Sequence, residues 1–352
     1  MLAEVERATA RGGWAYGYLG YEAAAAFGLP VHPPDPDGPP LAWFGLSLPP
    51  ERLPGLGAPA SPYRALWTPA WSEADHHREV ELVRDRIADG ETYQTNLTVR
   101  MHGLLDCTPQ TLYQHLARGQ AGAHHAYLDL GRFVIASASP ELFFERRRDH
   151  VVLRPMKGTA PRGRDPVEDH AHAAALRSSE KERAENVMIV DLMRNDIARV
   201  ARPGSVRVPA LLRVERYPTV LQLTSDVTAE LEPGTGLVEL FGALFPCGSV
   251  TGAPKRSSMD LIRRLEPTPR GVYCGAIGWV APPGAPVRAR FNVAIRTAVA
   301  DRRTGTAVYG AGGGITWGSD PAAEHREVLA KTAILLPRRE PVSGGPGSRR
   351  GS

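Results

Sequence analysis

One stretch of the sequence joins a strand pattern to a helix pattern: AVYGAGGGITWGSDPAAEHREVLAK, residues 307–331. The apolar, glycine-rich run that ends at Trp317 is typical of a strand that another backbone approaches closely. Ser319 or Asp320 can cap the helix that follows, and Pro321 suits its first position. The sequence therefore predicts a glycine-rich strand and then a helix over residues 321–336.

The rest of the chain alternates between the same two patterns. Apolar residues at spacings of three and four predict helices over 72–88, 178–201, 235–244 and 256–265. Runs of β-branched and aromatic residues predict strands at 14–21, 92–101, 132–140, 150–156 and 205–228. A proline-dense stretch, residues 30–69, predicts extended segments and loops. Strands with flanking helices indicate a mixed α/β (α+β) class.

Length and composition restrict the class of protein. The 352 residues are 42% hydrophobic and 23% charged, which allows a sizeable core in one large domain or two ordinary ones. The net charge of +4 comes from residues of both signs mixed along the chain, and no nucleic-acid-binding module is recognisable. Apolar runs are too short to span a bilayer, and three scattered cysteines suit a reducing compartment. We therefore expect a cytoplasmic protein that binds neither nucleic acid nor membrane.

Lysine is rare in this chain. Of the 42 basic residues 38 are arginine, and the four lysines are Lys157, Lys181, Lys255 and Lys331. Lys157 lies between a strand-like run and a glycine turn, in VLRPMKGTAPRG at 152–163. An amine can act as a nucleophile or base near neutral pH, whereas a guanidinium cannot. The pattern leaves two interpretations of Lys157 open, a reactive amine or ordinary sequence drift.

Carboxylates at helical spacing form two candidate pairs. Glu324 and Glu327 share a face of the last predicted helix, and Glu182 and Glu185 share a face of an earlier one. Two such pairs can meet around Mg²⁺, which prefers oxygen ligands. The alternative is that both pairs are solvated helix faces, and spacing does not decide between the two.

Two further features could transfer a proton or bind an anion. Glu141 follows a strand of mostly small, apolar residues, where burial would raise its pKa toward that of a useful general acid. The run GAGGG at 310–314 exposes backbone N–H groups that can cradle an anion, although glycine runs are often simple turns. GSVTGAPK at 248–255 does not meet the spacing of a nucleotide-binding phosphate loop.

Nine stretches occur together and in one order, and they resemble the chorismate-utilising enzymes, the family of anthranilate synthase component I and aminodeoxychorismate synthase component I. The stretches are GYLGYE (17–22), GETYQTNLTVR (90–100), SASPELFF (137–144), RPMKGTAPRG (154–163), ERAENVMIVDLMRNDIARVA (182–201), GSVTGAPK (248–255), CGAIGW (274–279), AIRTA (294–298) and YGAGGGITWGSDPAAEHREVLAK (309–331). Each is modest alone, and together they are very specific.

The resemblance implies a fold and a domain organisation. The fold is that of anthranilate synthase component I, α/β (α+β), with two packed, mostly antiparallel sheets flanked by helices. Residues 71–337 would form the chorismate-binding catalytic domain. A shortened N-terminal strand and proline-rich region, residues 1–70, would pack on it. Residues 338–352, rich in Gly, Ser, Pro and Arg, are expected to be a disordered tail.

The resemblance also implies roles for individual residues. Lys157 is similar to the nucleophile of the aminating subgroup, where anthranilate-forming members typically have alanine. Glu141 resembles the general acid, and Glu185 and Glu327 resemble ligands of Mg²⁺, with Glu324 close by through water. Substrate-binding positions would be Arg296, Tyr309, Thr251, Gly252, Gly312, Gly313, Gly314 and Lys331.

In the aminating subgroup, an uncharged lysine amine attacks C2 of chorismate while the C4 hydroxyl leaves, and ammonia then adds at C4 and displaces the lysine. Gln222 stands where anthranilate-forming members, and some aminating members, have histidine. Because the resemblance links this histidine with pyruvate elimination in the anthranilate-forming branch, glutamine agrees with a product that keeps its enolpyruvyl group. None of the cysteine contexts resembles the nucleophile elbow of a glutaminase. The resemblance therefore implies a separate glutamine amidotransferase subunit as the source of ammonia.

Three alternatives remain at this stage. Anthranilate synthase component I and, more remotely, isochorismate synthase would handle the same substrate and metal, but Lys157 disfavours the first. The third is a catalytically inactive chorismate-binding partner subunit, which the intact Lys157, Glu141, Glu185 and Glu327 disfavour.

Family members usually carry more residues before GYLGYE, including part of a tryptophan-binding regulatory pocket. We therefore expect no feedback inhibition by tryptophan. Steady-state assays with and without tryptophan test this expectation, and a tryptophan-dependent loss of activity would contradict it.

Overall fold

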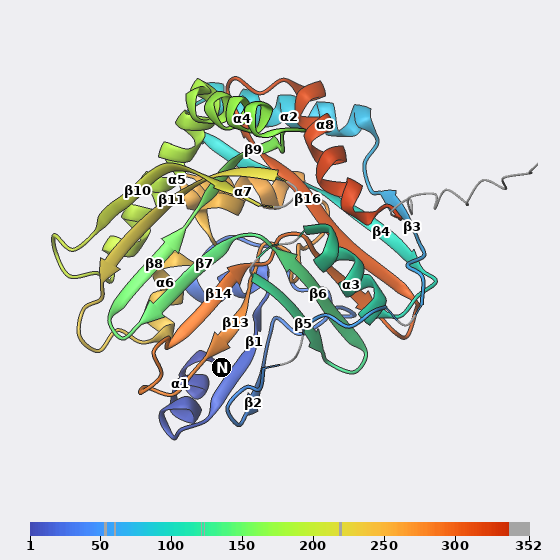
Figure 1. Cartoon of the computed structure of the whole chain (residues 1–352). Coiled ribbons are helices and arrows are strands. Elements are labelled where there is room, and N and C mark those ends of the chain that lie inside the picture. The colour runs from blue at the N-terminus through green and yellow to red at the C-terminus, as the bar shows by residue number, and fades with distance from the viewer. Residues whose placement is uncertain (53–54, 60, 121, 123, 218–219, 338–352) are drawn as a thin grey trace, which may run out of the picture.

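The computed structural model describes residues 1–52, 55–59, 61–120, 122, 124–217 and 220–337. Two antiparallel sheets pack against each other, and helices cover their outer faces (Figure 1). The predicted class, α/β (α+β) with two packed, mostly antiparallel sheets flanked by helices, is confirmed. The expected tail at 338–352 lies outside the described residues, and the division at residues 70 and 71 stays a prediction.

The first sheet has nine strands, in the order β10-β11-β8-β7-β14-β13-β1-β2, with β9 paired to β11. Its strands are β1 (Trp14–Leu19), β2 (Ala42–Ser47), β7 (Leu142–Arg147), β8 (His150–Arg154), β9 (Met156–Pro161), β10 (Arg207–Arg216), β11 (Val220–Glu230), β13 (Ala276–Val280) and β14 (Ala289–Val293). The N-terminal strands β1 and β2 therefore belong to the same sheet as β9, which carries Lys157.

The second sheet has seven strands, in the order β12-β4-β16-β15-β6-β5, with β3 paired to β4. Its strands are β3 (Ala65–Pro69), β4 (Gln94–Leu105), β5 (His124–Asp129), β6 (Phe133–Ser139), β12 (Gly252–Ala253), β15 (Thr297–Asp301) and β16 (Thr306–Thr316). In the long β4–β16 ladder Gly312 lies opposite Thr98, and a Cβ on Gly312 would collide with the carbonyl oxygen of Leu97. Glycine is required there because the neighbouring backbone lies so close.

Helices follow the caps that the sequence provides. The α-helices are α1 (Leu2–Ala10), α2 (Glu73–Ala88), α3 (Pro109–Gln120), α4 (Pro166–Ser178), α5 (Glu180–Ala198), α6 (Leu237–Leu244), α7 (Lys255–Leu265) and α8 (Pro321–Thr332), and the 3₁₀ helices are η1 (Tyr21–Phe27), η2 (Gly248–Val250) and η3 (Ala333–Leu335). Ser72 and Asp75 form a capping box at the start of α2, and Asp320 caps α8. Within the described residues, no helix has both the length and the apolar character needed to cross a bilayer.

The predicted helices need correction. The predicted helix over 178–201 is α5, which is shorter, and a separate helix, α4, precedes it. Asp165 caps α4 by accepting hydrogen bonds from the backbone N–H groups of Val167 and Glu168, with Pro166 in the first turn. These cap residues are visible in the sequence. Helices α1 and α3 were also missed.

Apolar packing seats the helices on the sheets. On the first sheet, Phe143, Phe144 and Phe291 pack against Phe241 of α6, and the ring centroids of Phe144 and Phe241 are 5.4 Å apart. On the second sheet, Leu116 of α3 and Val328 of α8 belong to one buried cluster with strand alanines. This packing fixes α5 and α8 on the sheets and so determines where their polar side chains lie.

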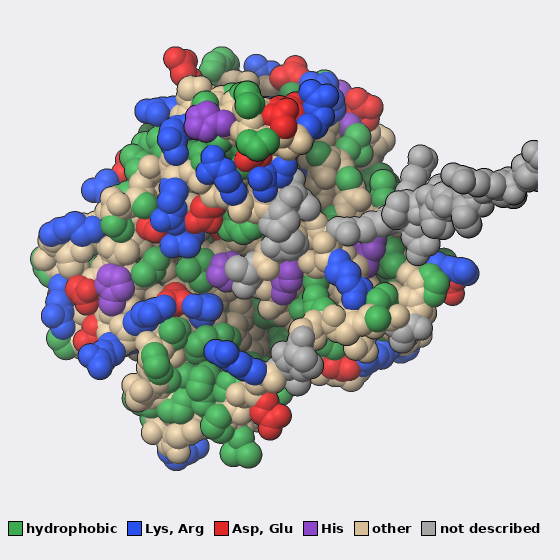
Figure 2. All heavy atoms as spheres, in the orientation of Figure 1, with side chains coloured by type: hydrophobic (Ala, Val, Ile, Leu, Met, Phe, Trp, Pro, Cys, Tyr) green, Lys and Arg blue, Asp and Glu red, His purple; other side chains and the backbone are tan. Residues whose placement is uncertain are grey.

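Charged side chains of both signs are interspersed over the molecular face shown in Figure 2. This distribution agrees with the mixed charges of the sequence. It gives no support to a nucleic-acid-binding surface on this face, where a basic stripe would be expected.

Arg270 connects β4 to the loop before β12 from inside the molecule. Its guanidinium pairs with Glu266 in two hydrogen bonds, of 2.6 and 2.8 Å, and the Arg270 side chain is 2% exposed. It also donates to the carbonyl oxygens of Asn96 and Val250, at 2.8 and 2.7 Å. One buried cation therefore holds β4 and the loop before β12 together.

We expect Arg270→Met to lower the free energy of unfolding by about 3–5 kcal/mol, because it leaves the Glu266 carboxylate buried without its partner. The control is Arg194→Met, which breaks an exposed pair with Asp191 and should cost roughly 1 kcal/mol or less. Urea unfolding of both variants makes the measurement. Equal losses would contradict the structural role of Arg270.

Candidate active site

A cavity of about 670 Å³ lies where β9, α5, α8 and the glycine-rich end of β16 meet. Most of the predicted site residues line it: Lys157, Glu141, Glu185, Glu324, Glu327, Lys331, Arg296, Tyr309, Gly312, Gly313 and Gly314. Residues that are far apart in the sequence are thus brought to one place. A second cavity, of about 400 Å³, lies on the other side of Tyr273 and Gly310, and none of the predicted site residues lines it.

Lys157 enters the cavity from an irregularity in β9. Thr224 and Gln222 of β11 pair with Met156 and Thr159 of β9, so β9 has one extra residue between these pairs. Such a bulge re-aims a side chain, and Gly158, with φ +87°, takes the backbone conformation that the bulge requires. The side chain of Lys157 is 14% exposed. Gly158 therefore helps to direct the side chain of Lys157 into the cavity.

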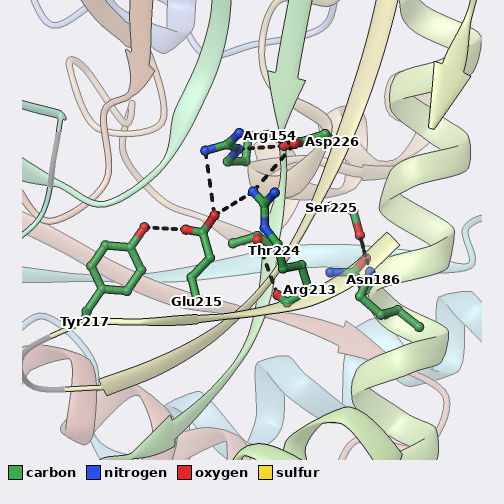
Figure 3. Close-up of polar contacts among 9 residues, drawn as sticks. Arg154, Asn186, Arg213, Glu215, Tyr217, Thr224, Ser225 and Asp226 are labelled. Atoms are coloured by element: carbon green, nitrogen blue, oxygen red, sulfur yellow. Dashed lines mark hydrogen bonds and ion pairs between the residues drawn. The ribbon is translucent and has the colours of Figure 1, made fainter. Parts of the chain in front are cut away.

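A polar network holds α5 against β11 (Figure 3). Ser225 of β11 donates a hydrogen bond to the side-chain oxygen of Asn186 on α5, at 2.6 Å. Asp226 lies on the other face of β11 and pairs with Arg154, also at 2.6 Å. Because Asn186 directly follows Glu185, this network fixes where the carboxylate of Glu185 enters the cavity.

The glycine-rich strand lets α8 approach the cavity. A Cβ on Gly313 would lie 3.1 Å from Glu324 Oε2 and 3.6 Å from Glu327 Oε1. Glu324 is buried, and its Oε1 accepts a hydrogen bond from Ser319 at 2.7 Å. The absence of side chains on β16 therefore leaves room for the two carboxylates of α8.

Lysines and glutamates alternate around this cavity. Lys157 Nζ lies 4.0 Å from Glu185 Oε2, and Lys331 Nζ lies 2.7 Å from Glu327 Oε1. Lys331 also donates to the carbonyl oxygen of Gly312 at 2.6 Å. Lys181, which the sequence prediction did not include, lines the same cavity. Three of the four lysines of the chain thus meet here.

Burial and the lysines act in opposite directions on these carboxylates. Burial raises the pKa of Glu185, although Lys157 and Lys181 partly offset this effect. Burial acts in the same direction on Glu327, but the positive charge of Lys331 outweighs it, and the pKa of Glu327 is lowered. The site therefore holds carboxylates with different proton affinities side by side.

Glu141 has the properties of a general acid. Its side chain is 3% exposed, and Oε1 accepts a hydrogen bond from Ser249 at 2.7 Å. Burial raises the pKa of Glu141 to about 7, and the hydrogen bond from Ser249 and the nearby charge of Lys157 only partly offset this rise. A carboxyl with such a pKa can both hold and release a proton near neutral pH.

Arg296 and Tyr309 also line the cavity. Arg296 has φ +49°, a conformation that non-glycine residues rarely adopt and that is often found at binding sites. Burial lowers the pKa of Arg296 and raises that of Tyr309 to about 12. A poorly solvated guanidinium beside a phenol is suited to binding a carboxylate.

Two predicted substrate contacts lie outside the cavity lining. Thr251 donates its hydroxyl hydrogen to the carbonyl oxygen of Cys247 at 3.1 Å, and Gly252 pairs with Thr95 of β4. The preceding residues Ser249 and Val250 line the cavity in their place. A role for Thr251 and Gly252 in binding stays a prediction.

Sequence reasoning missed Gln94. Its side chain is fully buried, and within the described parts of the chain neither its amide nitrogen nor its oxygen has a hydrogen-bond partner. A Cβ on Gly314 would meet both this amide nitrogen and Lys157 Nζ, so the two groups lie close together. An unpaired buried amide costs about 1–3 kcal/mol, which marks Gln94 as a candidate substrate contact. A polar residue at the start of a predicted strand was the available signal.

The site offers oxygen donors that suit Mg²⁺, but ammonium groups lie among them. Glu185 from α5 and Glu324 and Glu327 from α8 line one cavity, and carboxylates are ligands of the type that Mg²⁺ takes. No group of three or more His, Cys, Asp or Glu side chains is placed to hold a metal ion, as far as the structure describes the chain. The residue types therefore fit the ion, and the carboxylates must move closer together to bind it.

Comparisons with known proteins agree with this fold and cavity. Residues 51–337 match the family described as chorismate binding enzyme. Anthranilate synthase component 1 of Streptomyces coelicolor is 44% identical, over 77% of this chain and 52% of its own length. Aminodeoxychorismate synthase component 1 of Bacillus subtilis is 40% identical, over 75% of this chain and 55% of its own length. The chain thus spans about half the length of these relatives.

The crystal structure of anthranilate synthase component I from Streptococcus pneumoniae TIGR4 has the same fold. It matches with a TM-score of 0.81 at 27% identity, and the match covers 95% of this chain and 85% of that chain. Fold and cavity thus define a two-sheet protein of the anthranilate synthase component I type. The chain belongs to the chorismate binding enzyme family.

We expect the carboxyl of Glu141 to titrate with a midpoint near pH 7. Ser249→Ala should raise this midpoint, because the hydrogen bond that favours the ionised form is lost. The measurement is the infrared band of the protonated carboxyl, taken as the difference from Glu141→Gln. Ser178→Ala, at an exposed serine, should leave the midpoint unchanged. A wild-type midpoint in the ordinary carboxyl range, about 4.3, would contradict the assignment.

Proposed function

We propose that the chain is the chorismate-aminating component of an aminodeoxychorismate synthase. It would convert chorismate and ammonia into 4-amino-4-deoxychorismate, the precursor of para-aminobenzoate for folate synthesis. The observation that carries the proposal is the amine of Lys157, which enters a cavity lined by the carboxyl of Glu141 and by Arg296. Relatives named aminodeoxychorismate synthase, at 38–44% identity, support the same activity.

The first half of the proposed reaction replaces a hydroxyl by lysine. The uncharged amine of Lys157 attacks C2 of the ring, both conjugated double bonds of the ring shift, and the C4–O bond breaks. Glu141 gives its proton to the departing hydroxyl, so water leaves, and the new secondary ammonium returns a proton to Glu141. A carboxyl with a pKa of about 7 suits both transfers.

The second half replaces lysine by ammonia. Ammonia attacks C4, both ring double bonds shift back, and the C2–N bond to Lys157 breaks. Glu141 protonates the departing amine, and the new C4 ammonium returns one proton to Glu141. Lysine and glutamic acid are thereby restored, and arginine in place of lysine could not take this part.

The cavity lining offers binding groups for both carboxylates of chorismate. Arg296, Tyr309 and the backbone of Gly312–Gly314 would hold the enolpyruvyl carboxylate. Glu185, Glu324 and Glu327 would hold Mg²⁺, which when bound supplies positive charge beside the ring carboxylate. Fixing both ends of the substrate would present C2 to Lys157.

The nitrogen would come from a separate glutamine amidotransferase subunit. Cys247 and Cys274 are buried, and burial raises the pKa of each thiol to about 12, the opposite of what a glutaminase nucleophile needs. The name component 1 of several relatives supports a multi-component enzyme. Three free cysteines support a reducing cytoplasm as the place of the reaction.

Anthranilate synthase is the second candidate, because a relative of that name is 44% identical. Gln222 lines the cavity and accepts a hydrogen bond from Thr159 at 3.2 Å, at the position where anthranilate-forming members have histidine. Together with Lys157 it favours a product that retains the enolpyruvyl group. An inactive binding subunit is a poorer candidate, since the acid, the amine and the carboxylates line one cavity.

We expect the purified chain with chorismate, Mg²⁺ and ammonium chloride to form 4-amino-4-deoxychorismate, identified by mass spectrometry. Lys157→Ala and Lys157→Arg should both abolish this product, because neither side chain supplies a nucleophilic amine. Glu141→Gln should slow it by about 10²–10⁴-fold. Anthranilate from the wild-type chain would refute the subgroup, and isochorismate would refute amination. Unchanged turnover in Lys157→Ala would remove the lysine from the mechanism.

A further inference from the structure

Lys181 lies between carboxylates from two different helices. Its Nζ atom is 4.0 Å from Glu185 Oε1 on α5 and 3.5 Å from Glu324 Oε1 on α8. The side chains of Glu185 and Glu324 are 13% and 4% exposed, whereas that of Lys181 is 51% exposed. The ammonium therefore reaches from the surface into the space between two poorly hydrated anions.

The three cavity lysines are held to different degrees. Lys331 has a close ion pair with Glu327 and a hydrogen bond to the backbone of β16. Lys157 is mostly buried in its bulge. In the described structure Lys181 has longer ion pairs and its ammonium donates no hydrogen bond. Half of its side chain faces solvent, so Lys181 can leave its place most easily.

An ammonium in this place compensates a repulsion. Two carboxylates that approach each other in a poorly solvated site destabilise the protein unless a cation lies between them. A divalent cation held jointly by α5 and α8 would need the same space and the same oxygen atoms. Lysine and metal cannot both occupy it.

We propose that Lys181 is a built-in competitor of the divalent cation: its ammonium occupies the space between Glu185 and Glu324 in the metal-free protein and moves to solvent when the cation binds. This inference rests on the metal use in the proposed function. Lys181 then has two opposite effects, since it stabilises the metal-free protein and weakens metal binding. The two effects are linked, because the stabilisation that Lys181 gives the metal-free protein is lost when the metal binds.

The test compares Lys181→Gln with Arg183→Gln. Both changes remove one positive charge from α5, but Arg183 is exposed and lies outside the cavity lining. Without substrate, calorimetric titration with MgCl₂ gives the dissociation constant. Thermal melts with and without MgCl₂ give the stability of each form.

We expect Lys181→Gln to bind Mg²⁺ about fivefold to tenfold more tightly than the wild type, and Arg183→Gln to bind it nearly as the wild type does. Lys181→Gln should melt at a lower temperature than Arg183→Gln without metal, and saturating MgCl₂ should remove this difference. The recovery shows that the variant is folded. Lys181→Met should behave in the same way, because the ammonium and not the amide decides the effect.

Equal affinities in the two charge variants would overturn the proposal, because only the total charge would then matter. Weaker binding in Lys181→Gln would overturn it too, since Lys181 would then assist the metal. If neither the wild type nor Lys181→Gln binds Mg²⁺, the competition does not exist. None of these results depends on turnover, so a failure of amination, seen in the product assay, is distinguished from a failure of this inference.

Discussion

The site depends on pairing lysine ammonium groups with glutamate carboxylates in a partly buried cavity. Lys157, Lys181 and Lys331 meet Glu185, Glu324 and Glu327 at 2.7–4.0 Å. The side chains of Lys157, Glu185 and Glu324 are only 14%, 13% and 4% exposed, so leaving these charges unpaired would destabilise the protein. The positions of both sets must therefore be fixed by the fold.

Local features of several elements fix these positions. The bulge at Lys157 and Gly158 aims the amine inward, and the hydrogen bond between Ser225 and Asn186 sets the depth of α5. The glycine-rich end of β16 leaves the space into which α8 carries its carboxylates. Arg270 holds the strand and the loop behind the cavity together. Each feature lies in a different element, so the cavity forms only when both sheets are packed.

The sequence predicted the type of fold and most of the residues in the cavity, for identifiable reasons. Glycines at 312–314 and the cap at Asp320 are local signals, and they led directly to β16 and α8. The meeting of α5 with α8 is not local, because pairs such as Lys181 and Glu324 are far apart in the chain. From spacing alone, Glu324 and Glu327 could be either metal ligands or part of a solvated helix face. The packing of α8 on β16 places both carboxylates in the cavity.

The same limit explains the residues that sequence reasoning missed. Gln94 is a candidate because its amide is buried, and Lys181 is a candidate because carboxylates from two helices surround it. Sequence periodicity reveals neither property. Helix α4 had recognisable caps, but the two serines at its end were assigned to the following helix alone. Thr251 lies beside the cavity lining and not in it, a difference of one or two residues that motif likeness does not resolve.

The central claim is that the amine of Lys157 forms a bond to the substrate ring. The most direct measurement is peptide mapping by mass spectrometry after incubation with chorismate and Mg²⁺ in the absence of ammonia. The account predicts that the peptide containing Lys157 gains the mass of chorismate less one water, and that added ammonium removes this adduct. An adduct on a different lysine, or amination by a protein whose Lys157 peptide never gains mass, would contradict it.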